Sequence, residues 1–211
     1  MNDSDQALFD RAAELCREDG IQLGDRERDL LELHANLVRQ FNPVVSLVSR
    51  SDLASLWTRH IVDSLSLAPV LAKLGLANGM LLDIGSGGGY PAIPLKIALP
   101  ELRITMLERS ERKVGFLRKV VGALGLQSVD ILHGEYPRDA DSITPDALTA
   151  RAVERGEELG IEIAANLAPN TVFLSQSGQP PRPGSIATPI NDPWTTQGLR
   201  RGQLTLIRLS Q

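Results

Sequence analysis

One aspartate and three glycines, Asp83, Gly85, Gly87 and Gly89, occupy every second position of the short segment Asp83–Gly89. The segment directly follows an apolar run that is typical of a buried strand. Ligands of doubly wound α/β sheets bind beyond the carboxyl ends of the strands. Glycine permits a tight turn there and lets a ligand approach the main chain, because no Cβ is in the way. These four residues therefore predict a ligand-binding loop.

Two common nucleotide-binding loops do not fit this spacing. In the dinucleotide pattern G-x-G-x-x-G, counted from Gly85, the last position falls on Tyr90, whose ring is too bulky for close packing of helix on strand. No Gly-Lys-Ser/Thr follows, which excludes the phosphate loop of nucleoside triphosphatases. A dinucleotide site and a plain tight turn with a capping aspartate remain the less favoured alternatives.

Carboxylates end two successive apolar runs, Asp83 the first and Glu108 the second. S-adenosylmethionine carries a ribose diol from which Glu108 can accept hydrogen bonds, and its amino group and sulfonium are cations that acidic residues favour. It has no phosphate, so its loop needs no anion site at a helix N-terminus. The loop and its two acids predict S-adenosylmethionine as the cofactor.

Length and composition set broad limits on the protein. The 211 residues, 42% of them hydrophobic, suffice for one sizeable core or for one domain with a small helical extension. No run approaches the roughly 20 apolar residues of a membrane span, and the acidic start is unlike a secretory signal. Cys16 is the only cysteine, and the three histidines have no ligand spacing. We expect a cytoplasmic protein with no membrane partner and no metal, and the oligomeric state stays open.

Basic residues cluster in one predicted helix and near the end of the sequence, although the formal net charge of the chain is −4. The clustered residues are Arg109, Arg112, Lys113, Arg118, Lys119, Arg200 and Arg201. Proteins that bind nucleic acid through its phosphates are usually basic, at least locally. From charge alone a solvated helix face is the favoured explanation of the cluster, so charge argues mildly against a nucleic-acid partner without excluding one.

The first third of the chain has a helical pattern. Apolar residues recur at three- and four-residue steps through two stretches that Gly20 and Gly24 separate. Pro43 is expected to end the second helix, because proline cannot continue it. A third helix is expected over residues 51–73. We therefore predict an N-terminal helical extension over residues 1–75.

The pattern changes after residue 75, where short apolar runs alternate with helix-like stretches. Strands are expected at 80–84, 102–107, 129–132, 147–150 and 171–174, and helices at 93–99, 112–124 and 157–167. Residues 179–192 are rich in proline and predict a loop, and 204–209 predict a closing strand. Strands that alternate with helices favour parallel pairing with helices on both faces. The predicted fold class is α/β, a doubly wound, mostly parallel sheet over residues 76–211.

Four blocks of this sequence resemble the bacterial small-subunit ribosomal RNA guanine-N7 methyltransferases, once called glucose-inhibited division protein B. The blocks are Trp57–Leu65, Leu82–Leu95, Glu108–Leu117 and Thr149–Ala152. The spacing between the blocks matches as well, and the resemblance runs from about Leu30 to Leu174. It implies a Rossmann-like class I methyltransferase domain over residues 76–211, with S-adenosylmethionine as cofactor and ribosomal RNA or the small ribosomal subunit as partner.

The resemblance also implies a set of site residues. Cofactor contacts would fall on Gly85, Tyr90 and Glu108, on the main chain around Tyr136 and Pro137, and on Arg151. The substrate-side candidates, a polar cluster at helical spacing, are Arg59, His60, Asp63 and Ser64. Capping and hydrogen bonds within the helix would explain that cluster almost as well. Methyl transfer to guanine N7 uses a free lone pair and needs no general base, so we assign no catalytic residue.

The sequence departs from the family pattern on the presumed substrate side. The family's Asn-Leu-Thr is Ser46-Leu47-Val48 here, and its Lys-Gly after the fifth strand is replaced by residues 175–178, which lack a cation. The tail is also shorter. Three hypotheses follow: a ribosomal RNA methyltransferase, a methyltransferase acting on a small molecule, and an inactive cofactor-binding module. Motif spacing favours the first, the lost lysine and the negative charge favour the second, and Asp83 with Glu108 speaks against the third.

Overall fold

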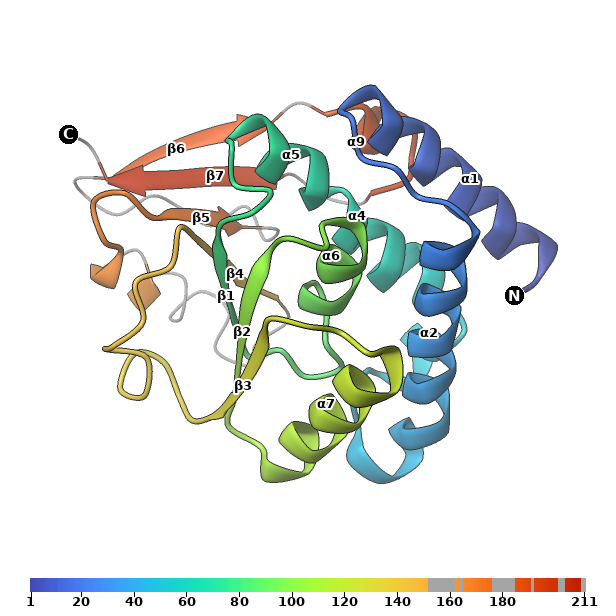
Figure 1. Ribbon diagram of the computed structural model, residues 1–211, viewed down its shortest axis with the longest axis horizontal. Coiled ribbons are helices and arrows are strands. Elements are labelled where there is room, and N and C mark those ends of the chain that lie inside the picture. The colour runs from blue at the N-terminus through green and yellow to red at the C-terminus, as the bar shows by residue number, and fades with distance from the viewer. Residues whose placement is uncertain (152–161, 164, 176–184, 191, 201–203, 210–211) are drawn as a thin grey trace.

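A mixed seven-stranded sheet forms the centre of the computed structural model (Figure 1). The model describes residues 1–151, 162–163, 165–175, 185–190, 192–200 and 204–209. The strands are β1 (Met80–Ile84), β2 (Arg103–Glu108), β3 (Val129–His133), β4 (Ala147–Ala150), β5 (Val172–Ser175), β6 (Ser185–Ile190) and β7 (Leu204–Leu209). They lie in the order β3-β2-β1-β4-β5-β7-β6.

The first five strands pair in parallel, whereas β7 is antiparallel to β5 and β6 is antiparallel to β7. The strand order runs outward from β1 to β3 on one side and from β4 to β5 on the other. Between β1 and β4 it therefore reverses. Such a switch point is where doubly wound sheets leave a crevice for ligands. The mostly parallel sheet confirms the predicted fold class.

Alternate residues of the central strands supply two hydrophobic cores, one on each face of the sheet. Leu81 and Met106 belong to the larger core, while Leu82, Ile84 and Leu107 belong to the smaller one. Successive side chains of a strand point to opposite faces, which is why neighbouring leucines enter different cores. A sheet that is buried on both faces agrees with the near-continuous apolar runs in the sequence.

The helices of the first 75 residues pack onto the helices that cover the larger core. Among the described residues the helices are α1 (Asp3–Glu18), α2 (Asp25–Val45), α3 (Arg50–Leu53), η1 (Trp57–Val62), α4 (Asp63–Leu65), α5 (Leu67–Lys73), α6 (Ala92–Ala98), α7 (Glu111–Leu124) and α9 (Pro193–Thr196). Helix α2 contacts both α6 and α7 (Figure 1). Helix α1 contacts η1. Both parts of the chain thus share one core, and their division at residue 75 stays a prediction.

Pro43 does not end α2, contrary to the prediction, since the helix continues to Val45. Proline removes the hydrogen bond to the carbonyl four residues earlier and crowds that carbonyl, but its fixed φ is compatible with a helix, so the last turn can continue after it. The helix ends at Ser46, which has a left-handed φ of 55°. The side chain of Asn42 then accepts hydrogen bonds from the main-chain N–H groups of Leu47 and Val48, both at 2.8 Å.

The single helix predicted for residues 51–73 is also wrong, because this segment forms α3, η1, α4 and α5 in succession. The hydroxyls of Ser64 and Ser66 donate to main-chain carbonyls of the preceding turn and compete with regular helix bonding. Pro69 removes a further donor. Of these pieces, η1 is a π-helical turn, a feature that is frequent at functional sites.

Two further predictions concern the second half of the chain. Strand β6 lies within the stretch that we expected to be a loop, and β7 forms as predicted. Most of the helix predicted for residues 157–167 lies outside the described residues. The other predicted strands and helices of the sheet region form within one or two residues of their expected bounds.

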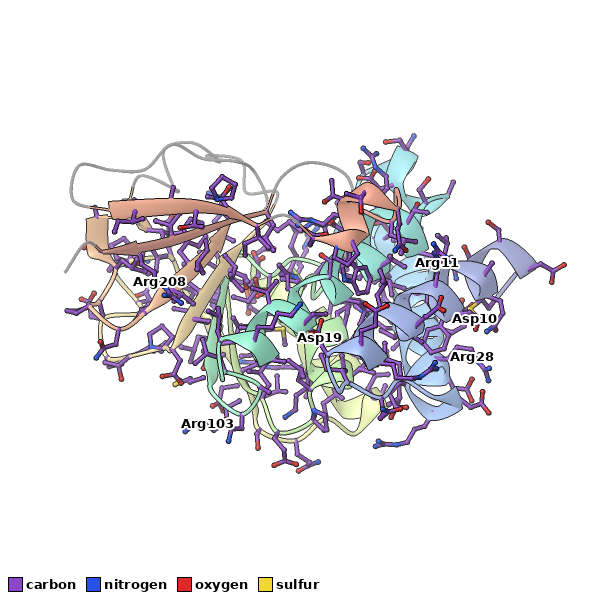
Figure 2. The ribbon with its side chains drawn as sticks, turned by 90° about the horizontal axis from the view of Figure 1, so that it is seen from above. Asp10, Arg11, Asp19, Arg28, Arg103 and Arg208 are labelled. Carbon is purple, nitrogen blue, oxygen red and sulfur yellow. The ribbon has the colours of Figure 1, made fainter. Side chains whose placement is uncertain are left out.

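Figure 2 views the molecule from above, with α1 and α2 at one end and β6 and β7 at the other. Asp10, Arg11 and Arg28 belong to that helical end, and Arg208 belongs to β7. None of the helices in the described part of the chain is long and apolar enough to cross a membrane.

Candidate functional site

The glycine loop connects β1 to the region of α6 at the switch point of the sheet. Gly85, Gly87 and Gly89 all have positive φ, at 72°, 52° and 87°. Any Cβ at Gly89 would lie 2.4 Å from Cδ1 of Ile93, so a side chain there would collide with the first turn of α6. The alternating glycines are therefore required by the backbone of this loop, as the sequence predicted.

Glu108 ends β2 beside this loop and is buried. Its Oε2 accepts a hydrogen bond of 2.9 Å from the N–H of Gly87, and its Oε1 accepts one of 2.8 Å from the N–H of Ser110. A carboxylate offers about four lone-pair sites, so each oxygen retains one for a further donor. Glu108 both fixes the loop and can accept hydrogen bonds from a diol.

Asp83 lies beneath the loop at the end of β1, completely buried. Its Oδ1 accepts a hydrogen bond of 2.8 Å from the hydroxyl of Thr149, its neighbour in the β1–β4 register. Burial raises the pKa of Asp83 to about 7, against the effect of hydrogen bonds from Ser86 and Thr149. Asp83 thus ties the two strands together where the order of the sheet reverses.

Tyr90 directly follows the glycine loop, and its ring packs against two rings of the N-terminal helices. Its centroid lies 4.7 Å from that of His34, on α2, and 4.9 Å from that of His60, on η1. All three side chains are largely buried, and burial lowers the pKa of both histidines to about 4. Both imidazoles are therefore neutral near pH 7.

Arg151 follows β4 and meets the substrate-side candidates, as their clustering in the sequence suggested. Its guanidinium donates to the main-chain carbonyls of Arg59 and His60 and lies 3.5 Å from the hydroxyl of Ser64. It also forms an ion pair of 3.0 Å with Asp63. The structure thus brings all five predicted residues together at the carboxyl end of β4.

Asp63 holds a second cation, Arg200, which the sequence did not assign to a site. The Nε of Arg200 lies 3.4 Å from Oδ1 of Asp63, and its Nη1 lies 3.3 Å from Oδ2 of Asp192. The side chain of Arg200 has 0% exposure, so it is not part of a solvated basic surface. Burial raises the pKa of Asp63 and lowers that of Arg200, and their opposite charges offset this cost.

Tyr136 and Pro137 are not part of this cluster in the structure. They line a separate cavity of about 240 Å³, together with residues that precede β4 and β5, such as Thr144, Pro145 and Thr171. The residues that line this cavity include none of the glycine loop, Asp83–Gly89. The predicted cofactor contact of Tyr136 and Pro137 stays a prediction.

Sequence reasoning assigned no role to Thr149, His34 or Arg200. A signal for His34 was present, because it lies four residues after Leu30 on the apolar stripe of its helix. A signal for Thr149 also existed, since parallel strands of known order would pair it with Asp83. The sequence pattern placed Arg200 only in a basic cluster, because its partner Asp63 comes from a distant segment.

The fold is the Rossmann-like fold of class I methyltransferases. It is defined by the order of the strands, by the antiparallel β7 and by the glycine loop at the switch point. Two solved structures share this fold. One is a mutant of MtNAS in complex with S-adenosylmethionine, with a TM-score of 0.59, 16% identity and coverage of 99% of this chain and 91% of that chain. The other is the O-methyltransferase TomG from Streptomyces achromogenes, with a TM-score of 0.56, 17% identity and coverage of 90% and 92%.

A family model for GidB, described as rRNA small subunit methyltransferase G, matches residues 27–183, and the chain belongs to this family. A Ribosomal RNA small subunit methyltransferase G from Ralstonia nicotianae is 30% identical over 203 residues, 92% of this chain and 90% of the relative. The relative of that name from Leuconostoc mesenteroides is 36% identical over 142 residues. That match spans 59% of the relative's length, and a 42% identical match to a Sorangium cellulosum relative spans 48%.

Proposed function

We propose that this protein is an S-adenosylmethionine-dependent methyltransferase that modifies guanine N7 of small-subunit ribosomal RNA. The observation that carries the proposal is the glycine loop at the switch point, bordered by Glu108 and Asp83, in a chain of the GidB family. The protein acts in the cytoplasm, with ribosomal RNA or the small ribosomal subunit as its partner.

The cofactor site of this proposal consists of the loop and the strand ends beside it. Glu108 accepts hydrogen bonds from the ribose diol with the lone pairs that Gly87 and Ser110 leave available. Gly85, Gly87 and Gly89 expose the main chain to the ligand, because they carry no Cβ. The contacts of the cofactor with Asp83, Tyr90, Tyr136, Pro137 and Arg151 belong to the same proposal. The residues fit a nucleoside that carries a cation and no phosphate.

The bound cofactor supplies an activated methyl group, and guanine N7 supplies a lone pair. The chain therefore has to position donor and acceptor at about 3–3.5 Å and to exclude water, without removing a proton. Arg151, anchored on Asp63 and on carbonyls of η1, is held in place for contact with the acceptor side. In this proposal the acceptor side of the site is lined by the residues around Arg151, namely Arg59, His60, Asp63 and Ser64.

A second candidate is a methyltransferase that acts on a small molecule. Residues 175–178 lack a cation where the resemblance expects a Lys-Gly, and Ser175, the last residue of β5, is completely buried. The net charge of −4 also favours a neutral or cationic acceptor over an RNA. An inactive cofactor-binding module is the third candidate, and the retained Asp83 and Glu108 speak against it.

Label transfer from S-adenosylmethionine to ribosomal subunits tests the proposed function. The protein is incubated with methyl-labelled cofactor and small subunits from a strain that lacks this modification. We expect the label at guanine N7 of the small-subunit RNA, identified by mass spectrometry of the digested RNA. Large subunits and heat-unfolded protein are the controls. Label that enters only small molecules from a cell extract would replace the ribosomal proposal with the second candidate, and no label at all would favour the third.

RNA binding is expected to weaken as salt increases, because basic side chains of α7 neutralise phosphates. Arg112 is exposed and Lys113 is partly exposed on that helix. Replacing both with alanine should flatten the log–log salt slope by about 1.5, since each phosphate contact contributes about 0.7–0.9. Affinity for S-adenosylhomocysteine should be nearly unchanged. Fluorescence anisotropy of labelled RNA over about 50–200 mM salt measures the slope.

The matched control for this prediction replaces two exposed arginines of α1, Arg11 and Arg17, with alanine. This removes the same charge from a different face, so general electrostatics would flatten the slope equally in both double variants. An equal change in the two variants contradicts an RNA-binding role of α7. Absence of RNA binding by the unmodified protein, even at low salt, contradicts the RNA substrate itself.

A further inference from the structure

His34 joins the N-terminal helices to the glycine loop. It lies on α2, is completely buried, and its Nε2 is 2.8 Å from the carbonyl oxygen of Gly88. Gly88 is also buried, so its carbonyl needs a donor from the protein. The two residues are separated by 54 positions in the sequence, and the contact forms only when α2 packs beside the sheet.

Glycines on the loop make room for this contact. A Cβ at Gly89 would lie 3.4 Å from Nε2 of His34, and a Cβ at Gly88 would lie 3.4 Å from ring carbons of Tyr90. A Cβ at either position would therefore lie in direct contact with the imidazole or with the phenol ring. The two glycines thus lie directly beside the rings of His34 and Tyr90.

Ring stacking adds a second contact between the same elements. The rings of His34 and Tyr90 lie 4.7 Å apart at an interplanar angle of 33°. Because Tyr90 directly follows Gly89, the stack and the hydrogen bond to Gly88 both hold the end of the loop that leads into α6. Burial lowers the pKa of His34 to about 4, so near pH 7 the neutral ring donates its Nε2–H to the carbonyl.

We infer that His34 is a positioning residue for the cofactor loop: its hydrogen bond to Gly88 and its stack on Tyr90 hold the loop in its binding conformation. His34 acts through these two loop residues and not by touching the cofactor itself. The inference rests on the proposed cofactor site. It gives α2 a role in cofactor binding, beyond the packing of the core.

Calorimetric titration with S-adenosylhomocysteine tests this inference on two substitutions. His34→Phe keeps a buried ring but has no donor, so it leaves the carbonyl of Gly88 unpaired. We expect its affinity to fall about tenfold or more, within the range for a buried hydrogen bond that loses one partner. His34→Gln keeps an N–H donor of similar reach. It should retain affinity within about threefold of the unmodified protein.

Leu31→Ala is the matched control, because Leu31 is a fully buried residue of the same helix that belongs to the core. It is expected to destabilise the fold at least as much as His34→Phe, with little change in affinity for S-adenosylhomocysteine. A loss of affinity that only follows the loss of stability across the three variants overturns the inference. If His34→Phe does not fold, Tyr90→Leu removes the stacked ring, and unchanged affinity in that variant overturns the inference as well. Failure of the unmodified protein to bind would instead overturn the proposed function.

Discussion

Replacing Asp63 with alanine is expected to lower the free energy of unfolding by about 3 kcal/mol. The carboxylate neutralises Arg151 at 3.0 Å and the fully buried Arg200 at 3.4 Å. Breaking a buried ion pair costs about 3–5 kcal/mol, because the remaining charge stays buried without compensation. The lower end applies here, since Asp192 still lies 3.3 Å from Arg200. Urea denaturation followed by circular dichroism measures the change.

Asp52→Ala is the control, because Asp52 forms an ion pair with Arg59 in the same helical region but nearer to solvent. The side chain of Arg59 is 46% exposed, against 0% for Arg200. An ion pair of this kind contributes at most about 1 kcal/mol. Combining Asp63→Ala with Arg200→Met should recover part of the lost stability, since no buried cation is then left at that position. Equal losses for Asp63→Ala and Asp52→Ala would contradict the buried network.

The central strands could be predicted because their signal is local. A parallel strand that is buried on both faces has a continuous apolar sequence, and β1, β2 and β4 have such runs. Strand β6 gave no such signal, because Pro189 lies within it and its neighbours are rich in proline. Among the strands that the structure describes, it pairs with β7 alone and lies at the edge of the sheet, where proline is tolerated.

In the site, too, the features with a local signal could be predicted and the long-range contacts could not. The glycine loop and the acids at its sides belong to strand ends that the sequence identifies, so their proximity follows from a parallel sheet. The contact between His34 and Gly88, and that between Asp63 and Arg200, join segments that are far apart in the chain. Such pairs depend on how helices pack onto the sheet, which composition and periodicity do not determine. For the same reason a buried Arg200 looked like one of a surface cluster.

Glu108→Ala should lower both cofactor affinity and stability. Loss of charged hydrogen bonds to the ribose diol is expected to cost about 1.5–3 kcal/mol of binding, which is roughly a 10- to 150-fold weaker affinity. The N–H groups of Gly87 and Ser110 also lose their acceptor. We expect the free energy of unfolding to fall by about 1–3 kcal/mol, the cost of leaving such a group unpaired. Calorimetry with S-adenosylhomocysteine and urea denaturation give the two quantities separately.

Two further variants separate the binding role of Glu108 from its structural role. Glu108→Gln keeps one oxygen that can accept from the loop, so it should recover much of the stability but less of the affinity, since the charge is absent. Asp130→Ala removes an exposed carboxylate from the adjacent strand β3 and should change neither quantity. Unchanged affinity in Glu108→Ala, together with lower stability, would mean that the carboxylate serves only to hold Gly87 and Ser110. The ribose would then have to be bound by main-chain groups of the loop.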